Sequence, residues 1–384
     1  MTRSSITFEV LQTNAALAEL EPEWRELFHR SGTSNPFAHP GWLGSWLETF
    51  VPSPDRRRIL AARRNGELIG VAPFYYRPVG HGRTLQLAGA PIQEDPLTEV
   101  SEVLVLPAAR RQLLPALVRE LAAEHADGCD WLALTLPASH GWFNDDWIPD
   151  AWRRRGAFSA HKSTRPFSVM PLGPSWDELP LHRNLKNAIN RAENRHARLA
   201  DRVAVRILTG TAVSEGAEQV QRLHRLRATA RRGAIHPDYF VDPRISKLGT
   251  IGVQRLAETD NACVVLCEID GEPVAGRIAL RAGGSAFVSY SGLDPRFWQL
   301  GSLTLLLVTI AQRAIEQGDR MLNLSLNPDP AKQRWTKQIE IHNEFVVVAP
   351  SRRSRLLFSL FWQARSARVL RQQIQRSGAE RSDG

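Results

Sequence analysis

Two similar hairpin turns, 205 residues apart (271 minus 66), constrain the fold more than any other feature of the chain. Asn65-Gly66 and Asp270-Gly271 each separate two alternating apolar segments. Asn-Gly and Asp-Gly are strong hairpin signals, because the two central positions of such a turn need positive φ. A spacing this long does not fit a solenoid repeat. We therefore expect a duplicated domain; the alternative is two unrelated hairpins with a common turn.

The segments around both turns follow the same order of predicted elements. Each hairpin is followed by a third strand, a helix and a last strand, as the change from alternating to helical periodicity predicts. This order indicates an α/β fold with mixed sheets (α+β mixed). The expected strands are 58–63, 68–76, 83–87, 103–106 and 131–136 in the first copy and 262–269, 274–280, 285–291 and 321–326 in the second, with helices at 108–125 and 302–317.

The composition is that of a globular protein, and 384 residues suit two domains that each bury a core. The three cysteines, Cys129, Cys263 and Cys267, form neither a disulfide framework nor a zinc motif. The start of the chain lacks the apolar core of a signal peptide. The longest apolar run, 303–311, is about half of the ~20 residues that a membrane-spanning helix needs. We expect a cytoplasmic protein, with the inner face of a membrane as the alternative.

Most of the positive charge lies in the last part of the chain. There are 49 Lys and Arg against 40 Asp and Glu, a formal charge of +9. Residues 351–384 hold eight arginines against Glu380 and Asp383, which is +6 of that total. Because the rest of the chain carries little net charge, binding to nucleic acid is not favoured.

The same tail carries a dense apolar cluster within residues 352–376. Arginines flank this cluster on both sides, and an exposed cluster of this size needs a partner. Two explanations stay open. The tail docks on the protein itself or on the partner in a homodimer, or it lies at an anionic membrane surface. The apolar residues are Leu356, Leu357, Phe358, Leu360, Phe361 and Trp362.

A basic helix is predicted within residues 182–202, between the two copies. Leu185, Ile189 and Ala192 recur at helical spacing on one face. Basic residues occupy the other faces, which indicates either a solvated helix or a basic wall beside an anionic ligand or membrane. These residues are Arg183, Lys186, Arg191, Arg195 and Arg198.

Motifs for hydrolases, kinases and metalloenzymes are absent: there is no HExxH, GxSxG, Walker loop or GxGxxG, and the histidines have no metal-ligand spacing. The strongest candidate for chemistry is the segment 285–303, where a strand leads through a loop to Gly301-Ser302 at the start of an apolar helix. The free amides and the dipole of a helix N-terminus form an anion site. The segment therefore predicts a phosphate-binding turn.

Short motifs over residues 35–340 give a family resemblance. In their order and spacing, the chain resembles the CelD-like (cellulose-biosynthesis) acetyltransferases, a branch of the GNAT superfamily related to the Fem aminoacyltransferases. The motifs are Asn35–Trp46, the hairpin at Gly66, Ser175-Trp176, Asn184–Ala192, Leu223–Arg227, Asp270–Ala275, Ser289–Pro295, Gly301–Leu306 and Ala331–Trp335.

The resemblance implies two tandem GNAT-like domains. Residues 1–165 would be an N-terminal, non-catalytic domain, residues 166–350 would be the catalytic domain with the acyl-CoA site, and residues 351–384 would be the basic, aromatic tail. The pantetheine of acyl-CoA would lie between strands 285–291 and 321–326. No metal is implied.

The resemblance also implies cofactor-binding residues. The diphosphate of acyl-CoA would lie on the amides at 301–303. The arginine or glutamine of the GNAT signature falls on Trp298, its last small residue falls on Leu303, and the tyrosine before the last helix is Ala331. The residues expected to bind acyl-CoA are Gln299, Gly301, Ser302, Leu303, Lys332 and Arg334.

Three residues are candidates for catalysis, each with a structural alternative. Tyr290 would protonate the leaving thiolate, or pack in the core. His224 would be the general base, because its ordinary pKa of about 6.5 suits that role, or lie on a helix surface. Asp294 would orient the acceptor, or form the Asp-Pro turn. Catalysis would otherwise rest on positioning and on a strand amide that polarises the thioester carbonyl.

The predicted function is acyl-CoA-dependent N-acyl transfer to an amine of an envelope lipid or a polysaccharide precursor. A sphingoid base is one such lipid, because some bacterial ceramide synthases are built on a similar domain. Two alternatives stay open. One is a Fem-type transferase that takes its aminoacyl group from charged tRNA, and the other is a non-catalytic GNAT scaffold in envelope biosynthesis.

Overall fold

The computed structural model divides into two compact units. Unit 1 comprises Met1–Tyr75, Leu87–Arg110 and Thr164–His342, and unit 2 comprises Tyr76–Gln86, Arg111–Ser163 and Asn343–Gly384. Each unit is made of separate segments of the chain, whereas the predicted domains 1–165 and 166–350 are continuous. The domain boundaries at 165 and 350 therefore stay a prediction. The structure describes residues 5–79, 82–89, 95–126, 131–137, 147–230 and 237–363.

The same order of elements, β-α-α-β-β-β-α-β, occurs twice along the chain when short turns and strand β5 are set aside. This repeat confirms the mixed α/β fold and supports the duplication inferred from the two hairpin turns. The first copy contains β1 (Thr7–Leu11), α1 (Asn14–Ser31), α2 (Pro40–Phe50), β2 (Arg57–Arg64), β3 (Glu67–Val79), β4 (Gly82–Leu87), β5 (Leu104–Val105), α3 (Arg110–Ala126) and β6 (Ala133–Pro137). The second copy contains β8 (Val203–Leu208), α6 (Val213–Ala228), α7 (Pro243–Ala257), β9 (Ala262–Ile269), β10 (Glu272–Ala282), β11 (Ser285–Leu293), α8 (Ser302–Glu316) and β12 (Met321–Leu326).

The remaining elements connect and follow the two copies. Helix α5 is the predicted basic helix, and its apolar stripe of Leu185, Ile189 and Ala192 is buried as expected. The elements outside the two copies are α4 (Asp150–Arg154), β7 (Phe158–Pro171), α5 (Arg183–Ala197) and β13 (Ile339–Val348).

In unit 1, the strands of the second copy form a sheet that opens at one position. Strands β8, β9, β10 and β11 pair antiparallel in that order, joined between β9 and β10 by the turn at Asp270-Gly271. Strand β12 then pairs parallel to β11, and the end of β7 pairs antiparallel to β12. Strands β11 and β12 are therefore parallel neighbours in this copy. Helix α8 connects them, because parallel strands need a long crossover connection.

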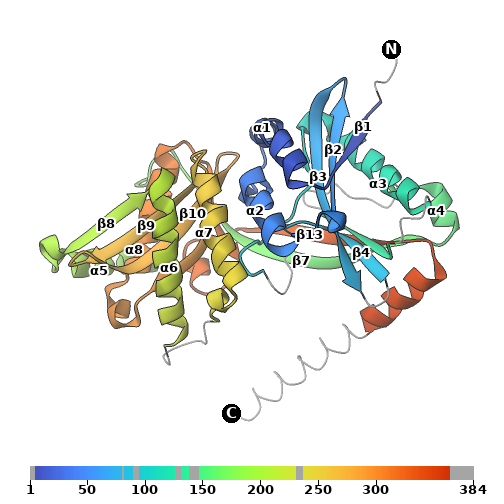
Figure 1. Ribbon diagram of the computed structural model, residues 1–384. Coiled ribbons are helices and arrows are strands. Elements are labelled where there is room, and N and C mark those ends of the chain that lie inside the picture. Colours follow the sequence, from blue (N-terminus) through green and yellow to red (C-terminus); the bar gives the residue numbers. More distant parts are fainter. Residues whose placement is uncertain are drawn as a thin grey trace, which may run out of the picture. The chain divides into compact units, whose positions relative to one another are not determined.

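Helices cover both faces of this sheet, as Figure 1 shows. Helices α6 and α7 pack on one face through residues such as Val220 and Leu248, and α8 packs on the other through Leu306 and Ile310. Each of these side chains is nearly fully buried, and burial of one such side chain stabilises the fold by ~1.5–3 kcal/mol. The strands between them are therefore covered on both faces, and every residue of β9 is buried although its sequence is interpreted as alternating.

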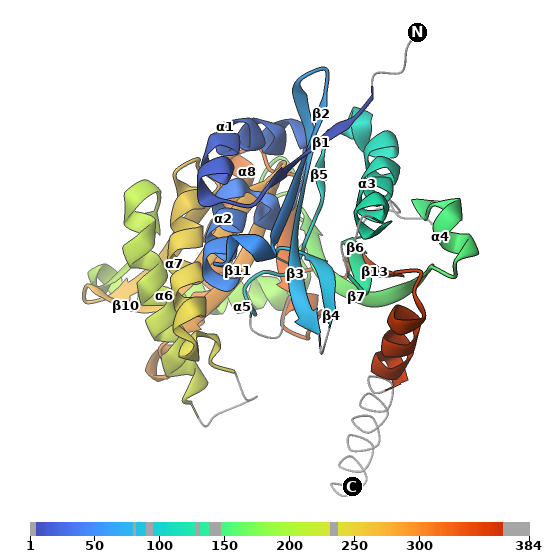
Figure 2. The ribbon, with the colours of Figure 1, turned by 45° about the vertical axis from the view of Figure 1, so that its right-hand side comes forward.

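Aromatic residues form the core of the first copy in unit 1. Helices α1 and α2 lie against strands β1, β2 and β3 (Figure 2). Trp24, Trp42 and Trp46 are buried there. The indole of Trp42 donates to Thr98 Oγ1 (3.0 Å), and that of Trp46 donates to Asp95 Oδ2 (2.8 Å). These two hydrogen bonds fix the segment 95–99, which reaches the candidate site.

Unit 2 contains β4, β6, β13 and the start of the tail. Strand β6 pairs antiparallel with β13 and parallel with β4. Residues 352–363 are helical and expose Leu356, Leu360 and Phe361. The rest of the predicted membrane-binding segment, 364–376, lies outside the described residues. Within the described part of the chain, no helix is long and apolar enough to cross a membrane.

Candidate active site

A pocket of about 710 Å³ opens in unit 1 where β11 and β12 separate. Strands β11 and β12 pair only from Ser285–Met321 to Phe287–Asn323. Beyond these residues, Val288–Ser291 and Leu324–Asn327 line opposite walls of the pocket. The predicted gap between two diverging strands is therefore open rather than filled by side chains.

Strand β12 leaves the sheet through a strained backbone. Ser325 and Asn327 both have positive φ, at 76° and 61°. Non-glycine residues adopt this conformation at an energetic cost, which is found most often at functional sites. The Ser325 amide donates to Asn323 Oδ1 (2.8 Å), and this local bond supports the turn.

Strand β11 carries an irregularity at the same level. In its pairing with β10, Val288 is opposite Ala279 and Ser291 is opposite Arg277, so two residues face Ile278 alone. These two residues are Ser289 and Tyr290, and they form a β-bulge. A bulge turns side chains and leaves backbone groups unpaired. Both residues of the bulge line the pocket.

The N-terminus of α8 forms one end of the pocket. Gly301 is its N-cap at φ 75°, without a side-chain cap. Within the described residues, the amides of Ser302 and Leu303 have no hydrogen-bond acceptor. The Ser302 hydroxyl is buried and lies 3.1 Å from His196 Nε2 on α5. The helix start thus offers free amides to an anion, as predicted.

Glu99 is a buried carboxyl group in the pocket wall that sequence analysis did not identify. Its carboxylate accepts hydrogen bonds from the Ser325 hydroxyl and from the Leu326 amide (2.8 Å). Burial raises the pKa of Glu99 to about 7, although these hydrogen bonds and the charges of Lys332 and Arg165 oppose the increase. A carboxyl group with such a pKa changes its protonation state near neutral pH.

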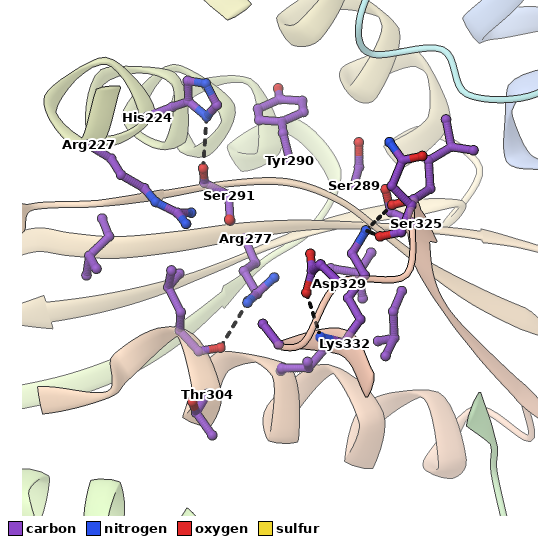
Figure 3. Close-up of a pocket in the computed structure, with 18 of the residues that line it drawn as sticks. His224, Arg227, Arg277, Ser289, Tyr290, Ser291, Thr304, Ser325, Asp329 and Lys332 are labelled. Atoms are coloured by element: carbon purple, nitrogen blue, oxygen red, sulfur yellow. Dashed lines mark hydrogen bonds between the residues drawn. The ribbon is translucent and has the colours of Figure 1, made fainter. Parts of the chain in front are cut away.

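Two guanidinium groups, from Arg227 on α6 and Arg277 on β10, point into the same pocket (Figure 3). Arg277 Nε donates to the Leu303 carbonyl in the first turn of α8 (3.0 Å). Burial lowers the pKa of Arg277 to about 10, with the nearby charge of Arg227 as a second cause. Burial also lowers the pKa of Arg227. Arg227 belongs to the motif Leu223–Arg227, but the sequence predicts no binding or catalytic role for Arg227 or Arg277.

The structure places two predicted catalytic residues, Tyr290 and His224, in the pocket wall. The Tyr290 hydroxyl donates to the Gly249 carbonyl (2.7 Å), and burial raises its pKa. His224 is buried, with Nδ1 3.0 Å from the Ser291 carbonyl oxygen and Nε2 3.1 Å from that of Pro237. Both side chains are thus hydrogen-bonded to backbone in this structure, and their catalytic roles remain predictions.

The third predicted catalytic residue, Asp294, lies outside the pocket lining. Its carboxylate accepts from the Arg296 amide (2.9 Å) and pairs with the Arg296 guanidinium (2.7 Å). The hydrogen bond from Arg296 lowers the pKa of Asp294. Asp294 caps the turn before α8 in this arrangement, which is the structural alternative considered for it.

The predicted cofactor-binding residues fall into two groups. Gly301, Ser302, Leu303, Lys332 and Arg334 line the pocket, and Gln299 does not. Gln299 is exposed, and its carbonyl accepts a hydrogen bond from Arg195 on the basic helix. The Lys332 ammonium donates to the carbonyls of Leu326 and Asn327 and so supports the turn after β12.

A metal site does not appear in the part of the chain that the structure describes: no group of three or more His, Cys, Asp or Glu side chains is arranged to hold an ion there. The buried thiols of Cys263 and Cys267 are free. Burial raises the pKa of Cys263 to about 11 and also raises that of Cys267, which keeps both protonated at neutral pH.

Comparison with known families gives one match, which covers α5 and the second copy. Residues 183–333 match the family model of the acetyltransferase (GNAT) domain. This range contains the separated strands, the α8 N-terminus, Arg227 and Arg277. The GNAT part of the predicted resemblance is thereby confirmed for this segment. No functionally curated protein matches the sequence.

Solved structures of the same fold extend over both copies. A conserved protein of unknown function from Bacteroides thetaiotaomicron has a TM-score of 0.58 at 11% identity, covering 89% of this chain and 100% of that one. FemX has a TM-score of 0.55 at 14% identity, covering 92% and 99%. L-PGS from Bacillus licheniformis has a TM-score of 0.52 at 12% identity, covering 89% and 93%. At these identities the likeness concerns the fold alone.

Proposed function

We propose that this protein is an N-acyltransferase that moves an acyl group from a CoA thioester to an amine. The observation that carries the proposal is the open separation of β11 and β12 beside the free amides of Ser302 and Leu303. In this arrangement the pantetheine lies between the strands and the diphosphate lies at the helix N-terminus. The GNAT match of residues 183–333 supports this reading.

In the reaction, the amine nitrogen attacks the thioester carbonyl carbon. A C–N bond forms, the C–S bond breaks, and CoA leaves as a thiolate that takes up a proton. Before the attack, the ammonium form of the acceptor loses a proton to a base, because only the neutral amine has the lone pair that forms the C–N bond. The pocket supplies two requirements for this step: backbone groups at the Ser289–Tyr290 bulge that can polarise the carbonyl, and positions that hold both substrates together.

We assign the role of general base to Glu99. Its carboxylate lines the pocket beside the strand separation and is nearly fully buried, at 8% exposure. A base works best when its pKa is near the working pH, and a pKa of about 7 meets this condition. His224 is kept as the second candidate base, Tyr290 as the proton donor to the thiolate, and Asp294 as an orienting residue.

We further propose that the acceptor belongs to the cell envelope, as a lipid or polysaccharide precursor. The exposed apolar residues of helix 352–363, among them Leu356 (61% exposed) and Phe361 (59%), support a peripheral position on an anionic membrane. A homodimer contact would be the other way to cover this face. The proposal places the protein in the cytoplasm, on the inner membrane face, and in the CelD-like branch of GNAT proteins.

A Fem-type transfer from aminoacyl-tRNA is the second candidate. The observation that favours it is helix α5, which packs against α8 and exposes the basic residues Arg183, Lys186 and Arg191. The fold shared with FemX is compatible with it. A scaffold without catalysis is the third candidate, and it predicts no affinity for either donor.

Thermal unfolding with candidate donors tests these functions. A ligand at 100 times its Kd adds about 2.7 kcal/mol to the free energy of unfolding. We expect stabilisation by acetyl-CoA or a longer acyl-CoA, with the preferred chain length indicating whether the product is a lipid. Stabilisation by aminoacyl-tRNA alone would favour the Fem-type reaction. No effect of any donor would leave only the scaffold.

A further inference from the structure

Arg227 and Arg277 both line the pocket, and neither has a carboxylate partner among the described residues. Arg281, four residues after Arg277 on β10, pairs with Asp319 (3.0 Å). On the surface, Arg255 pairs with Glu48 (3.2 Å). Arg227 and Arg277 form no such ion pair, although both are only partly exposed to water.

The carboxylates near these two arginines are engaged elsewhere. Glu99 accepts from Ser325 and Leu326, on the β12 side of the pocket. Asp329 accepts from the Lys332 amide (2.9 Å) and interacts with Arg227 only at longer range. Two like charges held together away from water cost free energy unless an anion joins them. The fold maintains this arrangement without supplying that anion.

The geometry around the two groups is that of a built site. Arg277 Nε is fixed by the Leu303 carbonyl, which leaves its two Nη groups toward the pocket. The Arg227 guanidinium carbon lies 5.7 Å from the centroid of the Trp298 ring, which gives it an aromatic contact. The free amides of Ser302 and Leu303 begin the same turn. Guanidinium groups and helix-start amides bind phosphate oxygens with matching geometry.

We propose that Arg227 and Arg277 form a binding site for a phosphate or diphosphate group in this pocket. The site would supply the positive charge that an arginine at residue 298 of the GNAT signature would bring, where this chain has Trp298. The phosphate belongs either to the acyl donor or to a phosphorylated acceptor. The inference deepens the proposed function because it concerns the same pocket.

Titration calorimetry with inorganic pyrophosphate tests the site directly in the full-length protein. We expect R227Q and R277Q each to weaken binding at least tenfold and the double variant to abolish it. R222Q is the matched control, because Arg222 is an exposed arginine on α6 outside the pocket lining, and it should change the Kd by less than twofold. Because Arg277 also contacts Leu303, R227Q tests the site without loss of that structural bond.

Two thioesters then identify the source of the phosphate. Acetyl-CoA carries the diphosphate, and S-acetylpantetheine does not. If the double variant weakens acetyl-CoA at least tenfold and leaves S-acetylpantetheine unchanged, the phosphate belongs to the donor. If it loses pyrophosphate binding but retains acetyl-CoA, the phosphate belongs to the acceptor, and phosphoethanolamine should then compete with pyrophosphate only in the wild type.

The proposed site and the proposed function can fail separately. If the wild-type protein binds pyrophosphate through these arginines but does not bind acyl-CoA, the proposal of acyl-CoA as donor is wrong and the proposed phosphate site still stands. A double variant that binds pyrophosphate as the wild type does would overturn the site, even if acetyl-CoA binds. Equal weakening by R222Q would also overturn it, because the effect would then reflect overall charge.

Discussion

At the scale of single residues, two glutamates three positions apart, the buried Glu99 and the half-buried Glu102, behave differently. Glu99 lines the pocket and contacts the start of the turn after β12, whereas Glu102 accepts from the Thr33 hydroxyl (2.6 Å) outside the pocket lining. Burial raises the pKa of both carboxyl groups. A shifted pKa alone therefore does not mark the base; the position in the pocket does.

The pair gives a matched test of the general base. We expect E99Q to lower kcat by about 10²-fold or more, the usual contribution of a positioned base, and E102Q to remain near the wild type. A base acts when deprotonated, so wild-type activity should fall as the pH decreases below about 7, and this dependence should be lost in E99Q. Steady-state rates from pH 5 to 9 check both statements. An E99Q profile like that of the wild type would return the role to His224.

At the scale of elements, helix α8 has a positive-φ glycine before its start and another after its end. Gly301 has φ 75° and Gly318 has φ 77°. A Cβ at Gly301 would lie 3.0 Å from the Cβ of Ala192 on α5, whereas a Cβ at Gly318 would meet nothing within 4 Å. Replacing either glycine by alanine would therefore strain the backbone at positive φ, but only at Gly301 would the new Cβ also lie close to a neighbouring side chain.

This difference predicts the behaviour of two alanine variants. We expect G301A and G318A each to reduce the free energy of unfolding by ~1 kcal/mol, because alanine is strained at positive φ. Only G301A should also weaken acetyl-CoA, by several-fold, because it disturbs the amides at the start of α8. Chemical denaturation and calorimetry measure the two effects. Equal donor affinity in both variants would argue against the diphosphate at this turn.

The sequence predicts the secondary-structure elements of the second copy better than it predicts the site residues that they carry. The hairpins, the strand before α8 and the glycine turn were predictable, because turn residues and alternation are local signals. The roles of Glu99 and Arg277 were not. Glu99 follows a segment held by tryptophan side chains from α2, and Arg277 sits inside an ordinary strand pattern. Their meeting in one pocket is a tertiary contact that no local pattern records.

At the scale of the whole molecule, the tail helix 352–363 presents an apolar face with arginines nearby. If this face lies on a membrane, its affinity combines buried apolar area with attraction to anionic lipids. If it pairs with a second copy, lipid composition has no effect. These two explanations were left open by the sequence, and they differ in what a vesicle experiment shows.

We expect the full-length protein to sediment with anionic vesicles and much less with neutral ones. The double variant L356S/F361S should reduce the sedimented fraction several-fold, with unchanged far-ultraviolet circular dichroism. V205S on β8 is a control for the loss of an exposed apolar side chain outside the tail, since Val205 is 43% exposed. Sedimentation that is insensitive to L356S/F361S, together with a dimer that dissociates in that variant, would assign the face to a homodimer.

The indole anchors of Trp42 and Trp46 have a consequence for any shortened form of the protein. They hold residues 95–99 from the first copy, and that segment closes one side of a chamber whose other walls belong to the second copy. A fragment limited to the recognisable acetyltransferase range would keep the donor cleft but lose its proposed proton acceptor.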